Sequence, residues 1–453
     1  MKNGGRLGFI GLVATLGSLA IACSPSRETD AGDTGVGNDA RTDARADAVE
    51  AGADVRDVPT TDAADAQDVT MPIDVVDVPA PMDVQDVPAP MDVVDVPAPM
   101  DVVDVPISTD TGPVVDGGMG PRFMVVRLGD GAGPLASTGA RVFLDEYTVS
   151  GTRTRSVALP GAMSGSNYPF VISGTATSEG SLSRSSDGHY VTLAGYAAAP
   201  ATAGVSSSAS ATTPRVVARV DSAGNVDTST TLTNAFDGNN VRTATSVDGT
   251  AFWVGGSGNT TTSVGGTHYV ALGGTMGTPI ETMPTSTRFL QVYADQLYGS
   301  SGTGAFQSVF TIGTGTPTTS GQTATVLPGL ATTIQAYAFV FVPAAVSGFT
   351  SDTLYIADDR ASGGGIHKYT YNATTMMWTA GLDATGLSAG VRGLTALVST
   401  AGTVTLVATT AETSANTVVT CADTTLATAP VCTVLVTAAT NQIFRGVALS
   451  PMP

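Results

Sequence analysis

Arginine recurs at one position of a repeated sequence pattern in the C-terminal two thirds of this 453-residue chain. Four strand-like segments begin with arginine as their first or second residue, namely Arg242, Arg288, Arg392 and Arg445. A guanidinium group offers five N–H donors in a planar fork, which suits the oxygens of a carboxylate or phosphate. If the starts of these segments meet in space, the four side chains form a site for a carboxylate, a phosphate or an acidic sugar.

A structural role for the same arginines is the alternative. Each arginine would then pair with a neighbouring acid such as Glu179 or Asp237, or would cap loop carbonyls. Glu179 and Asn240 themselves precede two of the strand-like segments. We therefore expect both at the same mouth, where they would add polar or metal-binding groups.

Asp358 and Asp359 form, with Arg360, the densest charge cluster of the C-terminal region. Paired carboxylates on a loop suit calcium, which takes oxygen ligands. The alternative is an exposed turn with an internal ion pair to Arg360. A calcium ion here is the only cofactor that the sequence suggests.

The pattern of nucleophiles and bases does not favour catalysis. The histidines His189, His268 and His367 lie far apart in the sequence, so a zinc site built from them is not expected. Ser164, in Met-Ser-Gly, lacks the Gly-x-Ser-x-Gly spacing of a nucleophile elbow. We therefore predict a protein that is not an enzyme.

The three cysteines fall into two groups. Cys23 ends a short apolar segment, whereas Cys421 and Cys432 lie in two strand-like segments joined by a turn. Two cysteines left over in an exported chain favour a disulfide over two reduced thiols. We predict a Cys421–Cys432 disulfide that contributes about 2–3 kcal/mol.

The N-terminus has the form of an export signal. Lys2 and Arg6 precede an apolar run at 7–22, which is shorter than the roughly 20 residues of a spanning helix and ends in small residues. The thiol of Cys23 is the nucleophile that can accept a lipid. We predict a lipoprotein signal peptide at 1–22 and lipidation of Cys23, which would attach the protein to a membrane.

The following segment, 23–120, is acidic and repetitive. Residues 24–120 contain 22 Asp and Glu against 4 Arg, and a nine-residue repeat such as MDVVDVPAP starts at Ile73, Met82, Met91 and Met100. Proline removes backbone donors, and like charges repel along the chain. We predict a disordered, extended stalk whose charge excludes nucleic acid as a partner.

The remaining residues, 121–453, are predicted to form an all-β head. Val, Thr and aromatic residues alternate in short runs between Gly, Pro, Asn and Asp turns. A unit of about 45–60 residues repeats, as expected for four-stranded propeller blades. Its opening strands are predicted at 180–183, 241–244, 288–291, 336–339, 391–394 and 444–447.

The last unit stops after its opening strand, because the chain ends at Pro453. Three predicted strands at 123–128, 141–147 and 155–159 lack an opener, so the C-terminal strand can complete their sheet. This arrangement would close a ring and leave only short sheet edges. We predict a six-bladed β-propeller, with seven blades as the alternative.

The head resembles bacterial six- and seven-bladed propellers, with the Asp-Gly turn and outgoing strand at 185–191 as the matching motif. The whole chain resembles a Gram-negative surface lipoprotein with an acidic stalk. That resemblance implies an outer-membrane location, surface exposure and, through Ser24 after Cys23, outer-membrane sorting.

Two functions follow. The first is a non-catalytic binding or scaffold module, a monomeric head on a flexible stalk that binds a glycan or an envelope protein. The alternative is an exported lactonase-like hydrolase with a metal in the central channel that activates water. Such a metal site requires several Asp, Glu, Asn or His side chains at the starts of the opening strands. At those positions this sequence has mostly Arg, Ser, Tyr or Gly.

Overall fold

The computed structural model describes residues 120–399 and 401–453. The predicted signal peptide, the lipidation site Cys23 and nearly all of the predicted stalk lie outside these residues. They stay predictions.

The regular secondary structure of the described chain is almost entirely β-strand. Their bounds are β1 Arg122–Leu128, β2 Gly139–Thr148, β3 Arg153–Ala158, β4 Val171–Ser173, β5 Ser183–Arg184, β6 Tyr190–Tyr196, β7 Arg215–Asp221, β8 Val226–Leu232, β9 Val241–Thr245, β10 Ala251–Gly256, β11 Gly266–Ala271, β12 Thr278–Glu281, β13 Phe289–Tyr293, β14 Gln296–Ser301, β15 Ser308–Ile312, β16 Ala324–Val326, β17 Ala336–Val342, β18 Thr353–Asp358, β19 Gly365–Asn372, β20 Met377–Ala380, β21 Val391–Val398, β22 Val404–Thr410, β23 Thr417–Asp423, β24 Val431–Thr437 and β25 Ile443–Leu449. Helical structure is limited to α1 (Ala344–Ser347) and two 3-10 turns, Val205–Ser207 and Gly304–Phe306. No helix in the described part of the chain is long and apolar enough to cross a membrane.

The turns between strands use the residues that their geometry demands. Before β6, Gly188 adopts a φ of +80°, a conformation that side chains with a Cβ rarely adopt. Ser185 Oγ donates to Asp187 Oδ1 at 2.6 Å and accepts from the Tyr190 backbone N–H at 2.9 Å. These bonds satisfy the polar groups of the turn and start β6 in the expected register.

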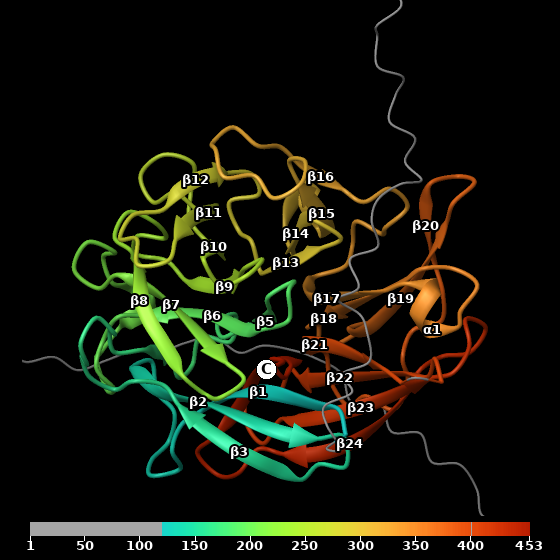
Figure 1. Cartoon of the computed structure of the whole chain (residues 1–453), viewed down its shortest axis with the longest axis horizontal. Helices are drawn as coiled ribbons and strands as arrows, with labels where there is room; N and C mark the ends of the chain where they lie inside the picture. Colours follow the sequence, from blue (N-terminus) through green and yellow to red (C-terminus); the bar gives the residue numbers. More distant parts are fainter. Residues whose placement is uncertain (1–119, 400) are drawn as a thin grey trace, which may run out of the picture. The chain divides into compact units, whose positions relative to one another are not determined.

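The strands pair in antiparallel sets. Four sheets have four strands each, β9 to β12, β13 to β16, β17 to β20 and β21 to β24. A nine-stranded sheet contains two further sets, β25-β1-β2-β3 and β5-β6-β7-β8, with β4 between β2 and β6. In Figure 1 the first strands β5, β9, β13, β17 and β21 lie toward the middle and the last strands lie toward the outside. An all-β head with several sheets is therefore present, as the sequence predicts.

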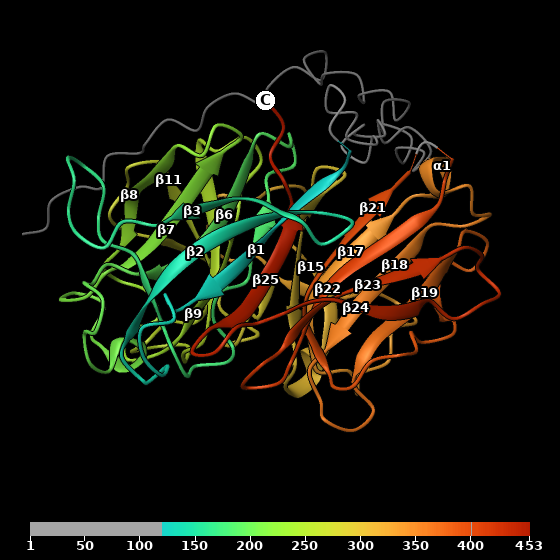
Figure 2. The ribbon, with the colours of Figure 1, turned by 90° about the horizontal axis from the view of Figure 1, so that it is seen from below.

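The C-terminal strand pairs with the first strand of the described chain. In the register of β25 and β1, Leu449 lies opposite Phe123 and Ala448 opposite Met124. Figure 2 shows β25 beside β1, although most of the described sequence separates them. The predicted pairing of these two segments is confirmed.

Hydroxyl groups connect one set of strands to the next. Thr192 on β6 donates to the Ala244 carbonyl on β9 at 2.8 Å, and Ser300 on β14 donates to the Tyr337 carbonyl on β17 at 2.6 Å. Thr409 on β22 donates to the carbonyl of Arg445 on β25 in the same way. Each bond joins a second strand to the first strand of the following set, so the first strands are held together near the middle.

Aromatic side chains fill the space between neighbouring sheets. Trp253 on β10 packs with Leu290 and Phe310 of the next sheet, whereas Trp378 on β20 lies 5.9 Å, ring centroid to ring centroid, from Phe341 of its own sheet. Both tryptophans are buried. Truncating such a side chain to alanine costs about 3–5 kcal/mol, so these contacts contribute strongly to the packing of the sheets.

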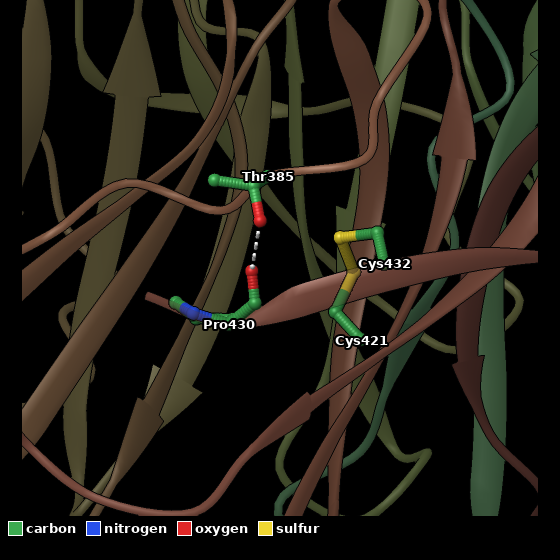
Figure 3. Close-up of a disulfide and its surroundings, with 4 residues drawn as sticks. All are labelled: Thr385, Cys421, Pro430 and Cys432. Atoms are coloured by element: carbon green, nitrogen blue, oxygen red, sulfur yellow. Dashed lines mark hydrogen bonds between the residues drawn. A yellow bond between two sulfur atoms is a disulfide. The ribbon is translucent and has the colours of Figure 1, made fainter. Parts of the chain in front are cut away.

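The predicted disulfide is present. Cys421 on β23 and Cys432 on β24 lie directly opposite each other, and their sulfurs are bonded. Figure 3 shows the bridge beside Thr385, whose hydroxyl donates to the Pro430 carbonyl at 3.5 Å. The bond closes a short loop on one edge of the β21 to β24 sheet.

Candidate functional site

Arg288 and Arg392 meet at the aromatic ring of Tyr337, the second residue of β17. Their guanidinium carbons lie 4.4 Å and 5.7 Å from the ring centroid. Both arginines also pair with Asp359, which follows β18, at N–O distances of 3.5 Å and 3.2 Å. One carboxylate and one aromatic ring thus hold two cations that come from separate sheets.

Arg242 and Arg445 belong to the same cluster but have fewer partners. Burial and the nearby Arg392 lower the pKa of Arg445 to about 10. Burial is also the main reason that the pKa of Arg242 is lowered, and Arg288 adds to it. Ser181 donates to the carbonyls of both Arg242 and Arg288, at 3.2 Å and 3.4 Å, and lines one cavity with Arg392 and Arg445, so all four predicted arginines lie in one region.

The hydrogen bonds of these two arginines are incomplete. Arg242 Nη1 donates to Ser286 Oγ at 2.6 Å, and Arg445 Nη2 reaches the Gly174 carbonyl at 3.5 Å. The Nε atom of each is buried and has no hydrogen-bond partner among the described residues. Buried polar groups are rarely left without partners in folded proteins.

Glu179 lies at the edge of the cluster in a network of its own. It accepts hydrogen bonds from the Tyr196 hydroxyl at 2.5 Å, from Asn240 Nδ2 at 2.6 Å and from the Ser173 backbone N–H at 3.0 Å. Burial raises the pKa of its carboxyl, and these hydrogen bonds oppose the rise. Glu179 and Asn240 thus lie together, as expected. Asn240 donates its hydrogen bond to the Glu179 carboxylate and so orients it.

A cavity of about 10 Å³ lies within the cluster. Glu179, Ser181, Tyr337, Arg392 and Arg445 are among the residues that line it. This volume corresponds to roughly one water-sized sphere. A single atom or the tip of an anionic group fits, whereas a whole acidic sugar, one of the expected ligands, does not enter.

The charges of the cluster do not balance. The four arginines face two carboxylates, Glu179 and Asp359. Asp237, the other acid expected as an arginine partner, instead accepts from the backbone N–H and the hydroxyl of Ser210, at 2.6 Å and 3.2 Å. The structural alternative therefore accounts for the pairs with Asp359 and for the hydrogen bonds from Arg288 and Arg392 to the carbonyls of Gln335 and Ala411, but it leaves an excess of positive charge.

The two carboxylates of the predicted calcium site have different partners. Asp358 is fully buried and pairs with Arg360 Nη2 at 2.6 Å and His367 Nε2 at 3.3 Å, whereas Asp359 faces the arginine cluster. The internal ion pair of the alternative interpretation is present, but at a buried rather than exposed carboxylate. Across residues 120–399 and 401–453, no group of three or more His, Cys, Asp or Glu side chains is arranged to hold a metal ion.

The three histidines lie in separate sets of strands. His189 precedes β6, His268 lies on β11 and His367 lies on β19. Burial lowers the pKa of His268 to about 4. Burial also acts against a charged His367, but hydrogen bonds to Asp358 and Asp383 prevail and raise its pKa to about 9.

Two functional features were missed in the sequence. Tyr337 occupies the position in its opening strand that arginine holds in others, which is a signal that could have placed it at the centre. The buried pair of Lys368 and Asp423 joins the β17 to β20 sheet to the β21 to β24 sheet at 2.7 Å. No local pattern marks that pair, because its residues are far apart in the sequence.

Comparisons with known proteins add little. No protein-family model matches the chain, and no curated protein sequence matches it. A solved structure of a "putative 6-phosphogluconolactonase" from Bacteroides uniformis is similar with a TM-score of 0.36 and 14% sequence identity, over 66% of this chain and 78% of that chain. A TM-score this low carries no argument about fold or activity.

Proposed function

We propose that this protein is an exported, lipid-anchored surface protein whose head is a six-bladed β-propeller and serves as a non-catalytic binding module for anionic ligands. The blade count is supported by six sets of four strands, and closure is supported by the pairing of β25 with β1. The anchor and stalk rest on the apolar run before Cys23 and on the acidic repeats. The stalk would carry the head away from the membrane.

One observation carries the binding function. Arg288 and Arg392 lie over the Tyr337 ring, and Arg242 and Arg445 lie near them, with only the carboxylates of Glu179 and Asp359 to balance the four charges. In a partly dehydrated site, unbalanced guanidinium groups attract anions more strongly than they do in water. The ligand is therefore a molecule with an exposed carboxylate, such as a glycan that contains uronic acid.

The partly exposed arginines form the entrance for such a ligand. Arg288 and Arg392 have side chains that are 14% and 15% exposed, and the cavity that Arg392 lines admits only a small group. A polymer would thus lie across the mouth and direct a carboxylate oxygen toward the guanidinium groups. Rim contacts of this kind give specificity for charge and depend on salt.

Retention of the whole protein on immobilised polygalacturonate tests the proposal, with its fully methyl-esterified form as the neutral surface. The Arg288→Gln/Arg392→Gln variant should bind the acidic polymer at least about tenfold more weakly than the parent, because two charge-assisted contacts are lost. Arg153→Gln is the matched control, since this arginine is 54% exposed on the outer strand β3 and pairs with Asp145. Equal retention of the double variant and the parent would overturn the proposal.

The lactonase-like alternative makes a different prediction. A metal bound only to the native state raises its melting temperature, so calcium and chelators should shift that temperature in opposite directions. The binding module predicts no shift with either addition. A calcium-dependent increase would favour the hydrolase.

A further inference from the structure

We infer that the cavity at the centre of the arginine cluster is a site for one monoatomic inorganic anion of halide size, held chiefly by Arg445 and Arg392. This inference rests on the proposed function, since it concerns the deep part of the same cluster. It assigns that part a ligand that is distinct from the carboxylate expected at the mouth.

The size of the cavity selects the ligand. Its volume of about 10 Å³ accepts one sphere, so sulfate, phosphate and sugars are too large. Gly446, which lines the cavity, packs tightly against the backbone of Leu182. A Cβ added to Gly446 would lie 2.2 Å from the Leu182 backbone nitrogen. A larger occupant would therefore require movement of the first strands themselves.

One buried donor of a residue that lines the cavity, Arg445 Nε, lacks an acceptor among the described residues, whereas the nitrogens of Arg392 already donate to Asp359 and the Ala411 carbonyl. Arg445 is 4% exposed, and its Nε atom has no partner in the described part of the chain. Its only side-chain hydrogen bond to a described residue, from Nη2 to the Gly174 carbonyl, is long at 3.5 Å. A guanidinium group in this state can donate to a further acceptor in the cavity that it lines.

The charges favour an anion over a water molecule. Arg392 and Arg445 both line the cavity, where burial and the charge of Arg392 lower the pKa of Arg445 and Glu179, which also lines it, acts in the opposite direction. Asp359 is shared by Arg288 and Arg392. Glu179 is occupied by Tyr196, Asn240 and the Ser173 backbone, and its oxygens form no ion pair with Arg445. A single negative charge between Arg392 and Arg445 would relieve their repulsion, which a water molecule cannot do.

Bromide provides a direct probe. The whole protein is melted in sodium methanesulfonate, whose anion is too large for the cavity, while bromide replaces it at constant ionic strength. The melting temperature should rise and then saturate with bromide, because the ion binds the native state. In Arg445→Gln, the bromide concentration for half of the effect should increase at least about tenfold, whereas Arg153→Gln should resemble the parent.

Anomalous diffraction from bromide-soaked crystals of the parent keeps the test independent of how the variant folds. A bromide peak between Arg392 and Arg445 is the expected result. Water alone at this position, or a melting temperature indifferent to bromide, would overturn the inference. Retention on polygalacturonate in the same bromide-free buffer separates the two proposals, since it persists if only the halide site is wrong and is absent if the proposed function fails.

Discussion

Two buried charged regions of the head differ in how completely their cations are paired. Lys368, on β19, is fully buried, and its Nζ atom contacts Asp423 at 2.7 Å and the carbonyls of Thr425 and Thr428 at 2.8 Å and 3.3 Å. The Tyr355 hydroxyl donates to the same Asp423 carboxylate at 2.6 Å. In the central cluster, by contrast, Arg242 and Arg445 keep buried Nε atoms without partners.

The difference separates a structural role from a binding role. An ammonium group has three donors, and Lys368 uses all three on groups of its own chain. That arrangement leaves nothing for a ligand and joins two neighbouring sheets. The central arginines retain donors and charge, so they suit a ligand supplied from outside.

The largest expected effect follows from breaking the paired region. Lys368→Met leaves the Asp423 carboxylate buried without its cation, which should lower the free energy of unfolding by about 3–5 kcal/mol. Denaturant unfolding measures this loss. The Lys368→Met/Asp423→Leu variant, which removes both charges, should recover most of it, and a similarly large loss in the double variant would contradict the pairing argument.

The disulfide beside that region should have the next largest effect. Replacing Cys421 and Cys432 with alanine removes a crosslink between residues 11 apart in the sequence, and should lower the free energy of unfolding by about 2–3 kcal/mol. Both sulfurs are buried, so binding to polygalacturonate should not change. Weaker binding by the folded variant would show that this sheet contributes to the site.

His367 should make stability depend on alkaline pH. Its folded pKa of about 9 is above the ordinary value near 6.5, so its contribution is fully present below pH 6.5 and is lost as the pH rises through about 9. We expect a loss of about 1–2 kcal/mol, reduced because Asp383 is exposed to solvent. Unfolding of the parent and His367→Gln at several pH values should show this loss in the parent alone, and parallel curves would refute it.

The smallest effect is expected at the centre. Arg242→Met removes a buried cation that has one hydrogen bond and is repelled by Arg288, so the free energy of unfolding should change by about 1 kcal/mol or less. Denaturant unfolding compares this change with that of Lys368→Met. A loss as large as the Lys368→Met loss would mean that the arginines are structural after all.

Sequence patterns predict the strands that recur in each unit of the fold, but they do not predict side-chain contacts that occur only once. The alternating segments that begin at Val241, Ala336, Val391 and Phe444 correctly indicate first strands, because strand periodicity is a local property. The gathering of the arginines follows from that repetition. The bridging role of Asp359 could not be predicted, since it depends on which sheets become neighbours and on the direction of one loop.

The buried lysine illustrates the same limit. Lys368 lies on a β-strand, and a lysine is rarely fully buried unless it is paired. Its burial depends on Asp423, on the next sheet, and on carbonyls of the turn that follows β23. The spacing of residues along either strand does not indicate this arrangement of a lysine, a carboxylate and loop carbonyls.

Crosslinking β25 to β1 tests most directly whether the C-terminal strand completes the first set and brings the arginines together. Met124 and Ala448 lie opposite each other, so Met124→Cys/Ala448→Cys should form a disulfide that peptide mapping detects in the native protein. The control pair, Met124→Cys with Ala338→Cys on β17, should remain unlinked. The account predicts the 124–448 crosslink and a higher free energy of unfolding, whereas two free thiols at these positions in the folded protein would contradict it.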